Sequence, residues 1–166
     1  HLGRTLAERV PGFINPAREV KGPAISMTKP KGLSRSEVEL LLQAADEHCL
    51  RNNNSFASRR NRFLLLLLLR TGLRADEARL LVASQLSEDG AWLKNVKTKG
   101  KKFRNVYLDS FVQDELAHYM LEREAEIRAK TPGYFQLNSS ERGRFPVFVS
   151  GYRASVLRPE SFGLSS

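Results

Sequence analysis

The sequence predicts a mainly helical α+β fold with a small antiparallel three-stranded sheet at one edge. Two stretches, residues 34–83 and 110–128, repeat apolar residues at helical spacing. Residues 91–108 instead alternate apolar and polar residues around a glycine-containing turn, which is typical of a β-hairpin. The helices are therefore expected to supply most of the core, with the sheet as a small addition.

The first helix is expected to begin at Ser34, because Ser34 and Glu37 have the spacing of a capping box. A second helix, from about residue 58 to residue 70, is apolar nearly all round and is expected to be central. Gly72 is placed to end it, since glycine readily adopts the left-handed conformation at a helix C-terminus. A third helix is expected over residues 74–83.

The hairpin is expected to pair residues 92–96 with residues 103–108, and Trp92 is expected to pack in the core. A fourth helix is expected to start near Ser110. Residues 131–145 are polar and predict a loop, and residues 146–149 predict a short third strand.

The composition favours a soluble protein with a polyanionic partner. The chain has 166 residues, with 27 Lys and Arg against 18 Asp and Glu, which gives a formal charge of +9. Such an excess favours nucleic acid as the partner. A single cysteine, Cys49, suits a reducing compartment, so a cytoplasmic, nucleoid-associated location is expected. The apolar run 63–69 is far shorter than the roughly 20 residues that span a membrane.

Residues 1–28 are dense in proline and glycine and predict an interdomain linker that follows an earlier element. Residues 29–166 predict the main domain. Because the chain starts at His1 and its last residues show no closing element, we expect a fragment of a longer protein. The three histidines have no metal-ligand spacing, so no metal site is predicted.

The candidate chemistry starts directly after the leucine-rich helix, at Arg74. An arginine that emerges from buried surroundings needs an anion, and Glu77 lies three residues on, on the same helix side. The oxygens of a DNA phosphodiester gain negative charge during cleavage, and fixed cations stabilise that charge. A planar guanidinium can bind two such oxygens at once.

A basic hairpin turn follows about twenty residues later. Cleavage leaves an alkoxide that needs a proton, and a lysine on a tight turn can act as the general acid. Lys99 is the first choice for this role and Lys97 the second. Two interpretations without a catalytic role stay open. Arg74 and Glu77 could form a pair that only stabilises a helix start, and the lysines of the turn could only be solvated.

Together these motifs resemble the tyrosine recombinase, or phage integrase, family. The segment Thr-Gly-Leu-Arg-x-x-Glu-x-x-x-Leu at residues 71–81 is similar to the family's first arginine box. Residues 99–104, Lys-Gly-Lys-Lys-Phe-Arg, resemble its hairpin motif Lys-Gly-x-Lys-x-Arg. Asn15-Pro16-Ala17 and residues 31–34 resemble the junction between the family's core-binding and catalytic domains, so residues 1–28 would end the former.

The resemblance implies an integrase-type catalytic domain that recombines or integrates DNA at specific sites through a 3′-phosphotyrosine. Arg74 would clamp the scissile phosphate, Glu77 would support it, and Lys99 would protonate the leaving 5′ oxygen. No cofactor and no obligatory metal would be needed, and several copies of the complete protein would act on double-stranded DNA. Further DNA-binding residues are expected in the linker, the second helix and the hairpin: Lys29, Lys31, Arg60, Lys97, Lys101, Lys102 and Arg104.

The sequence departs from the family pattern after the hairpin. No His-x-x-Arg box occurs after residue 118, and no tyrosine lies where the nucleophile would follow it. We therefore expect the 166 residues to be inactive by themselves. Two alternatives stay open: a non-catalytic DNA-binding regulator with the same fold, and an unrelated basic helical protein that binds RNA.

Overall fold

The computed structural model describes residues 32–100 and 102–149 of the chain. The chain divides into two units, residues 1–33 and residues 34–166. The first unit lies almost wholly outside the described residues, so the predicted boundary between residues 28 and 29 stays a prediction. The fold described below is that of the second unit.

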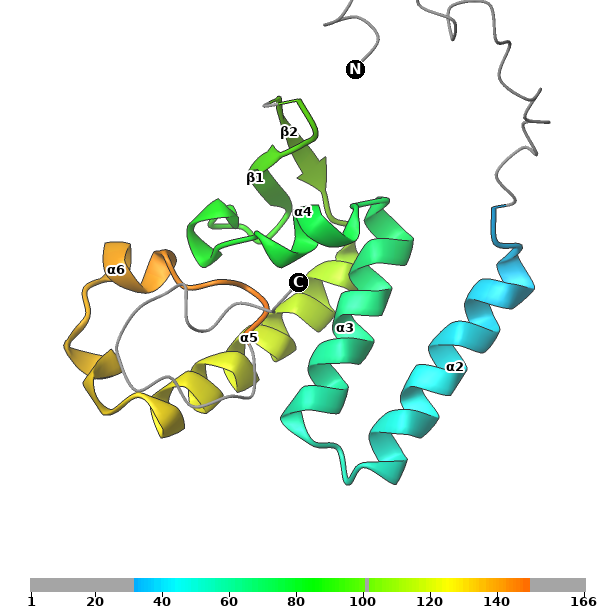
Figure 1. Cartoon of the computed structure of the whole chain (residues 1–166), viewed down its shortest axis with the longest axis horizontal. Helices are drawn as coiled ribbons and strands as arrows, with labels where there is room; N and C mark the ends of the chain where they lie inside the picture. Colours follow the sequence, from blue (N-terminus) through cyan, green and yellow to red (C-terminus); the bar gives the residue numbers. More distant parts are fainter. Residues whose placement is uncertain (1–31, 101, 150–166) are drawn as a thin grey trace, which may run out of the picture. The chain divides into compact units, whose positions relative to one another are not determined.

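Helices α2 (Arg35–Arg51) and α3 (Phe56–Thr71) form an antiparallel pair joined by a short turn (Figure 1). The predicted capping box is confirmed, since Ser34 Oγ accepts from the Glu37 amide and Glu37 accepts from the Ser34 amide at 2.7 Å. The predicted C-terminal glycine is confirmed as well. Gly72 has a φ of 64° and donates its amide to the Leu68 carbonyl, which closes the last turn of α3.

A short helix, α4 (Ala75–Arg79), follows directly, and a 3₁₀ turn, η1 (Ala83–Gln85), leads into the hairpin of β1 (Trp92–Lys97) and β2 (Phe103–Tyr107). The hairpin stands beside α4 at one end of α3 (Figure 1). The third predicted helix is thus much shorter than the expected 74–83. The Leu81 carbonyl bonds the Val147 amide and the Ala83 amide bonds the Phe145 carbonyl, so this stretch of backbone is used in tertiary contacts.

The prediction of a three-stranded sheet is wrong for the described residues, which contain two paired strands. Within residues 146–149, Pro146 makes an isolated bridge to Val82 and belongs to neither paired strand. Side chains take the place of a neighbouring strand here, because Arg123 Nε donates to the Pro146 carbonyl at 2.8 Å and the Tyr119 hydroxyl to the Val147 carbonyl at 3.0 Å. Buried backbone groups need partners, and these two residues of α5 supply them.

Helix α5 (Ser110–Lys130) packs against α3 and is followed by η2 (Pro132–Gln136) and α6 (Ser139–Gly143). Asp109 caps α5 by accepting from the Val112 amide. The predicted loop over residues 131–145 is therefore partly helical. Asn138 and Glu141 form a second capping box there, a signal that the polar composition had hidden.

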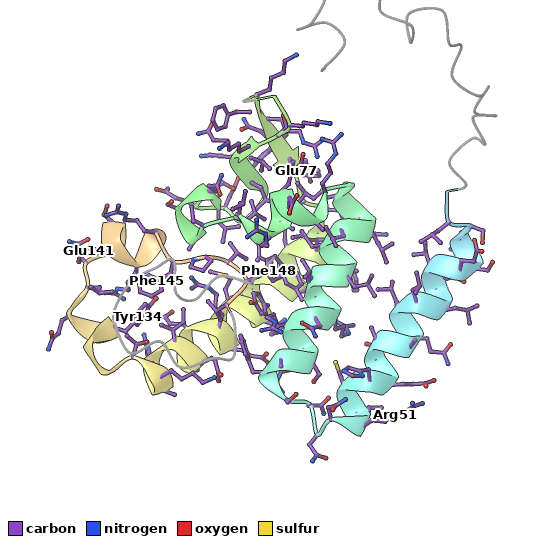
Figure 2. All side chains as sticks on the ribbon, in the orientation of Figure 1. Arg51, Glu77, Tyr134, Glu141, Phe145 and Phe148 are labelled. Atoms are coloured by element: carbon purple, nitrogen blue, oxygen red, sulfur yellow. The ribbon has the colours of Figure 1, made fainter. Side chains whose placement is uncertain are left out.

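The core lies between α3, α5 and the segment 145–149. Phe148, fully buried, stacks on Phe63 of α3 and Tyr119 of α5 with ring centroids 5.8 and 5.6 Å apart (Figure 2). Cys49 is buried as well. The prediction that Trp92 packs in the core is wrong, because its side chain is 41% exposed and meets Tyr107 edge-on across the hairpin. None of the helices in the described ranges is long and apolar enough to cross a membrane.

Candidate functional site

Arg74 is placed by the rigid end of α3. The left-handed turn at Gly72 reverses the chain, Leu73 anchors it in the core, and Arg74 follows in an extended conformation as the N-cap of α4. The Arg74 side chain is 68% exposed. The backbone at this point is anchored, while the guanidinium faces solvent and can meet a ligand.

The buried charge of the site belongs to Glu77, which is 5% exposed and lies at the base of the hairpin (Figure 2). Its carboxylate accepts from the Arg74 amide at 3.1 Å and from Arg74 Nη1 at 3.4 Å. Glu77 thus contacts both the backbone and the side chain of Arg74. The carboxylate also accepts from Arg104 Nη2 at 2.9 Å, a contact that the sequence did not suggest.

The surroundings of Glu77 lower the pKa of its carboxyl group. The hydrogen bond from the Arg74 amide is the main cause, and the charges of Arg104 and Arg74 add to it. Burial acts in the opposite direction but does not outweigh these contacts. Glu77 is therefore a stable anion at neutral pH, although little of it reaches solvent.

The hairpin carries an irregularity that sets the direction of its side chains. Leu93 pairs with Val106 and Val96 with Arg104, so two residues of β1, Lys94 and Asn95, oppose one residue of β2. Asn95 has a φ of 54°, a conformation that asparagine tolerates better than most residues. This is a β-bulge.

The bulge is held from both sides by side chains. Asn105 accepts the Asn95 amide at 3.0 Å, and Gln85 donates to the Asn95 carbonyl at 2.8 Å while accepting the Val82 amide. Because of the extra residue, Leu93 and Val96 both face the core although they are three positions apart. The strand thus stays anchored up to Val96, directly before the lysine-bearing turn.

The turn and α4 enclose one cavity of about 390 Å³. Its lining combines the arginine box with the hairpin: Arg74, Asp76, Glu77, Leu80, Lys97, Thr98 and Lys99. The structure therefore brings both lysine candidates to the cavity that holds Arg74. A positively charged hollow of this kind can receive an anionic group such as a phosphate.

The remaining predicted DNA-binding residues have different surroundings. Lys102 is exposed on the hairpin, as expected of a phosphate contact. Arg60 donates to the Val149 carbonyl at 2.8 Å, so it has a role in the fold as well. Arg104 is engaged with Glu77. Lys29, Lys31 and Lys101 lie outside the described residues. Within residues 32–100 and 102–149, no group of three or more His, Cys, Asp or Glu side chains could hold a metal.

Comparison with curated proteins finds three relatives. The chain is 31% identical to tyrosine recombinase XerH of Helicobacter pylori over 97 residues, 57% of the chain and 26% of the relative. It is 29% identical to tyrosine recombinase XerA of Thermococcus kodakarensis over 118 residues, 71% and 39% of the two lengths. It is 33% identical to tyrosine recombinase XerD of Caulobacter vibrioides over 111 residues, 67% and 34% of the lengths.

The chain belongs to the tyrosine recombinase family. It spans between 26% and 39% of the length of these three relatives. No protein-family model matches the chain, and no solved structure matches it either. The family assignment thus rests on relatives that are 29–33% identical to the chain over the aligned residues, and it agrees with the arginine box and the hairpin motif.

Two residues that shape this candidate site were missed in the sequence. Gln85 is polar and lies in a short 3₁₀ turn, with nothing local to show that it clamps the bulge ten residues away. Arg104 was assigned to DNA by its charge and its place in the hairpin motif. Its spacing from Glu77, 27 residues, carries no periodic signal, so the pairing depends on how the hairpin folds back onto α4.

The first prediction concerns acid stability. The pKa of Glu77 is lower in the folded domain than in the unfolded chain. The ionised carboxylate therefore adds fully to the free energy of unfolding above the pKa of the unfolded chain. This contribution is lost as the pH falls through the pKa of the folded domain. At neutral pH, Glu77→Gln is expected to cost about 1.5–3 kcal/mol, the range for hydrogen bonds to a charged group. Towards pH 3 the stability of the unsubstituted domain should fall towards that of the variant.

The measurement is urea unfolding of both proteins between pH 7 and pH 3. Glu88→Gln is the matched control, because Glu88 is an exposed glutamate in the turn before β1. That control should follow the unsubstituted domain at every pH. A difference between Glu77→Gln and the unsubstituted domain that persists unchanged to pH 3 would contradict the lowered pKa.

Proposed function

We propose that this chain is part of a site-specific recombinase that cuts and rejoins DNA strands during recombination or integration. The observation that carries the proposal is the cavity in which Arg74, Lys97 and Lys99 meet around the buried Glu77. Membership of the tyrosine recombinase family supports it, as does the basic composition of the chain. In this proposal residues 29–166 belong to an integrase-type catalytic domain.

The proposed reaction conserves the energy of the phosphodiester bond. A tyrosine hydroxyl attacks the scissile phosphorus, the bond from phosphorus to the 5′ oxygen breaks, and a 3′-phosphotyrosine forms. Arg74 binds the nonbridging oxygens, whose charge grows in the transition state. Lys99 gives a proton to the departing 5′ oxygen, and Glu77 holds Arg74 from behind. Rejoining is the reverse of these steps, so neither ATP nor a metal ion is needed.

The tyrosines of the described residues are poor candidates for the nucleophile. Tyr119 is buried, its hydroxyl donates to the Val147 carbonyl, and desolvation raises the pKa of that hydroxyl well above its usual range. Tyr134 is buried against Phe145, and Tyr107 meets Trp92 on the hairpin. We propose that the nucleophile and a second arginine come from sequence beyond these 166 residues, and that the 166 residues alone do not cleave DNA.

The complete gene product should form a covalent adduct with DNA. Incubated with duplex fragments of the DNA of its source, nicked at random so that the short strand 3′ of a cut, which carries the new 5′-hydroxyl, is lost, it is expected to yield a complex that survives denaturing detergent and is removed by protease. The physical reason is that loss of the 5′-hydroxyl strand prevents rejoining and leaves the phosphotyrosine in place.

Formation of the covalent adduct distinguishes an enzyme from a DNA-binding regulator. A regulator with the same fold would bind the fragments without any adduct, and that result would refute the proposed activity. Arg74→Ala in the complete product should strongly slow formation of the adduct, while DNA binding is weakened but persists. The 166-residue chain serves as a second control, and an adduct at Tyr107, Tyr119, Tyr134 or Tyr152 in that chain would overturn the assignment of the nucleophile.

A further inference from the structure

One carboxylate in the site serves two arginines that come from different elements. Glu77 of α4 bonds Arg74 Nη1 at 3.4 Å and Arg104 Nη2, from β2, at 2.9 Å. The shorter of the two ion pairs is therefore the one with the hairpin. Arg74 holds Glu77 more closely through its backbone amide, at 3.1 Å, than through its guanidinium.

The exposures of the three side chains show which charge is available to a ligand. Glu77 is 5% exposed, Arg104 is 45% exposed and Arg74 is 68% exposed. A buried carboxylate is costly unless a cation meets it. Arg104 supplies that cation, so the two arginines and one carboxylate leave a net charge of +1 at the site, and the most exposed guanidinium is that of Arg74.

We propose that Arg104 is a positioning residue: by neutralising the buried Glu77 carboxylate it keeps the Arg74 guanidinium free for a phosphate, and it ties the lysine-bearing hairpin to α4. This inference rests on the proposed function of the Arg74 site. It gives Arg104 a role that acts through Glu77, in place of the direct DNA contact that the sequence suggests.

The register of the hairpin supports the proposal that Arg104 ties the lysine-bearing hairpin to α4. Arg104 lies opposite Val96, and the next pair, Lys97 with Phe103, is the last before the turn. The turn is closed by the Thr98 amide, which donates to the Lys102 carbonyl at 2.7 Å. Anchoring Arg104 on Glu77 thus fixes the strand one residue pair before the segment that carries Lys97 and Lys99 to the cavity.

Loss of Arg104 would leave Arg74 as the sole guanidinium on Glu77 among the described residues. The Arg74 side chain would then be drawn to the carboxylate and away from solvent, because an uncompensated buried charge attracts the nearest mobile cation. Removing the carboxylate as well would abolish that attraction. The effect of Arg104 should therefore depend on whether Glu77 is present.

The first experiment is a carboxyl titration of Glu77 by nuclear magnetic resonance in the 166-residue chain. In Arg104→Gln the pKa of Glu77 is expected to rise, since a close positive charge is lost. Lys102→Gln removes the same charge from an exposed position directly before β2 and should leave the Glu77 titration unchanged. A Glu77 titration that is equal in the unsubstituted chain and in Arg104→Gln would overturn the proposal.

The second experiment is a double-mutant cycle on binding to a generic DNA duplex, measured at several salt concentrations. Arg104→Gln should weaken binding in the unsubstituted chain and have no further effect in the Glu77→Gln background. A direct phosphate contact would instead reduce the log–log salt slope by about 0.9 in both backgrounds. That outcome would overturn the positioning role and restore the interpretation of Arg104 as a DNA contact.

The two experiments test the proposed function and the role of Arg104 separately. If the unsubstituted chain bound no DNA even at low salt, the proposed function would lose its support, while the titration of Glu77 would still decide whether Arg104 controls that carboxylate. Arg104→Lys adds a further check. It retains the charge and should keep the Glu77 pKa low, which a purely steric role of the arginine would not predict.

Discussion

Replacing Lys99 with alanine in the complete gene product is expected to slow DNA cleavage by about 10²–10⁴-fold, the usual effect of losing a general acid. The reason is that the 5′ oxygen then leaves without a proton donor. A substrate with sulfur in place of that bridging oxygen should restore cleavage, because a thiolate is a stable leaving group without a proton. Single-turnover cleavage of the two substrates measures the rescue.

Arg74→Ala and Lys97→Ala are the matched controls for this experiment. Arg74→Ala is expected to lose about 10²–10³ in rate. The sulfur substrate should not restore that loss, since the charge on the phosphate oxygens stays uncompensated. Lys97 lines the same cavity, but the Lys97→Ala variant should be close to fully active. Full activity of Lys99→Ala together with an inactive Lys97→Ala would show that Lys97 is the proton donor.

Phe148→Ala is expected to reduce the free energy of unfolding by about 3–5 kcal/mol, the range for truncating a buried phenylalanine. Phe148 is fully buried and stacks on rings from α3 and α5, so the cavity left behind has rigid walls on both sides. Urea denaturation of the domain, compared at equal slope, gives the change.

Phe103→Ala is the control for that measurement, because Phe103 is exposed on the hairpin. It should change the stability by no more than about 0.5 kcal/mol, as for most surface substitutions. A loss below 1 kcal/mol in Phe148→Ala would mean that the segment 145–149 does not contribute to the core as the structure indicates.

The features predicted correctly from the sequence are those whose signals are local. The capping box at Ser34, the end of α3 at Gly72 and the two strands of the hairpin each depend on residues a few positions apart. The association of Glu77 with Arg74 has the same origin, a spacing of three residues at a helix start. The family resemblance also depends on such short motifs and agrees with the relatives found.

The features that were missed depend on contacts between distant segments. The short apolar run at residues 146–149 cannot be distinguished from a buried strand by its sequence. Only the folded chain shows that side chains of α5 donate to the carbonyls of Pro146 and Val147. The sequence placed Arg74 directly after buried residues and Glu77 beside it, but it did not show which of the two side chains is buried. In the structure the buried side chain is that of Glu77, and Arg104 of the hairpin forms an ion pair with it.

The β-bulge at Lys94 and Asn95 separates two properties of the hairpin that could change independently during evolution. The clamp by Gln85 and Asn105 fixes which residues of β1 face inward, whatever follows Val96. The length of the turn after Lys97 determines only how far its lysines extend over the cavity. Insertions or deletions in the turn would therefore alter the approach to a substrate without repacking the interior, whereas one residue added between Leu93 and Val96 would disturb both.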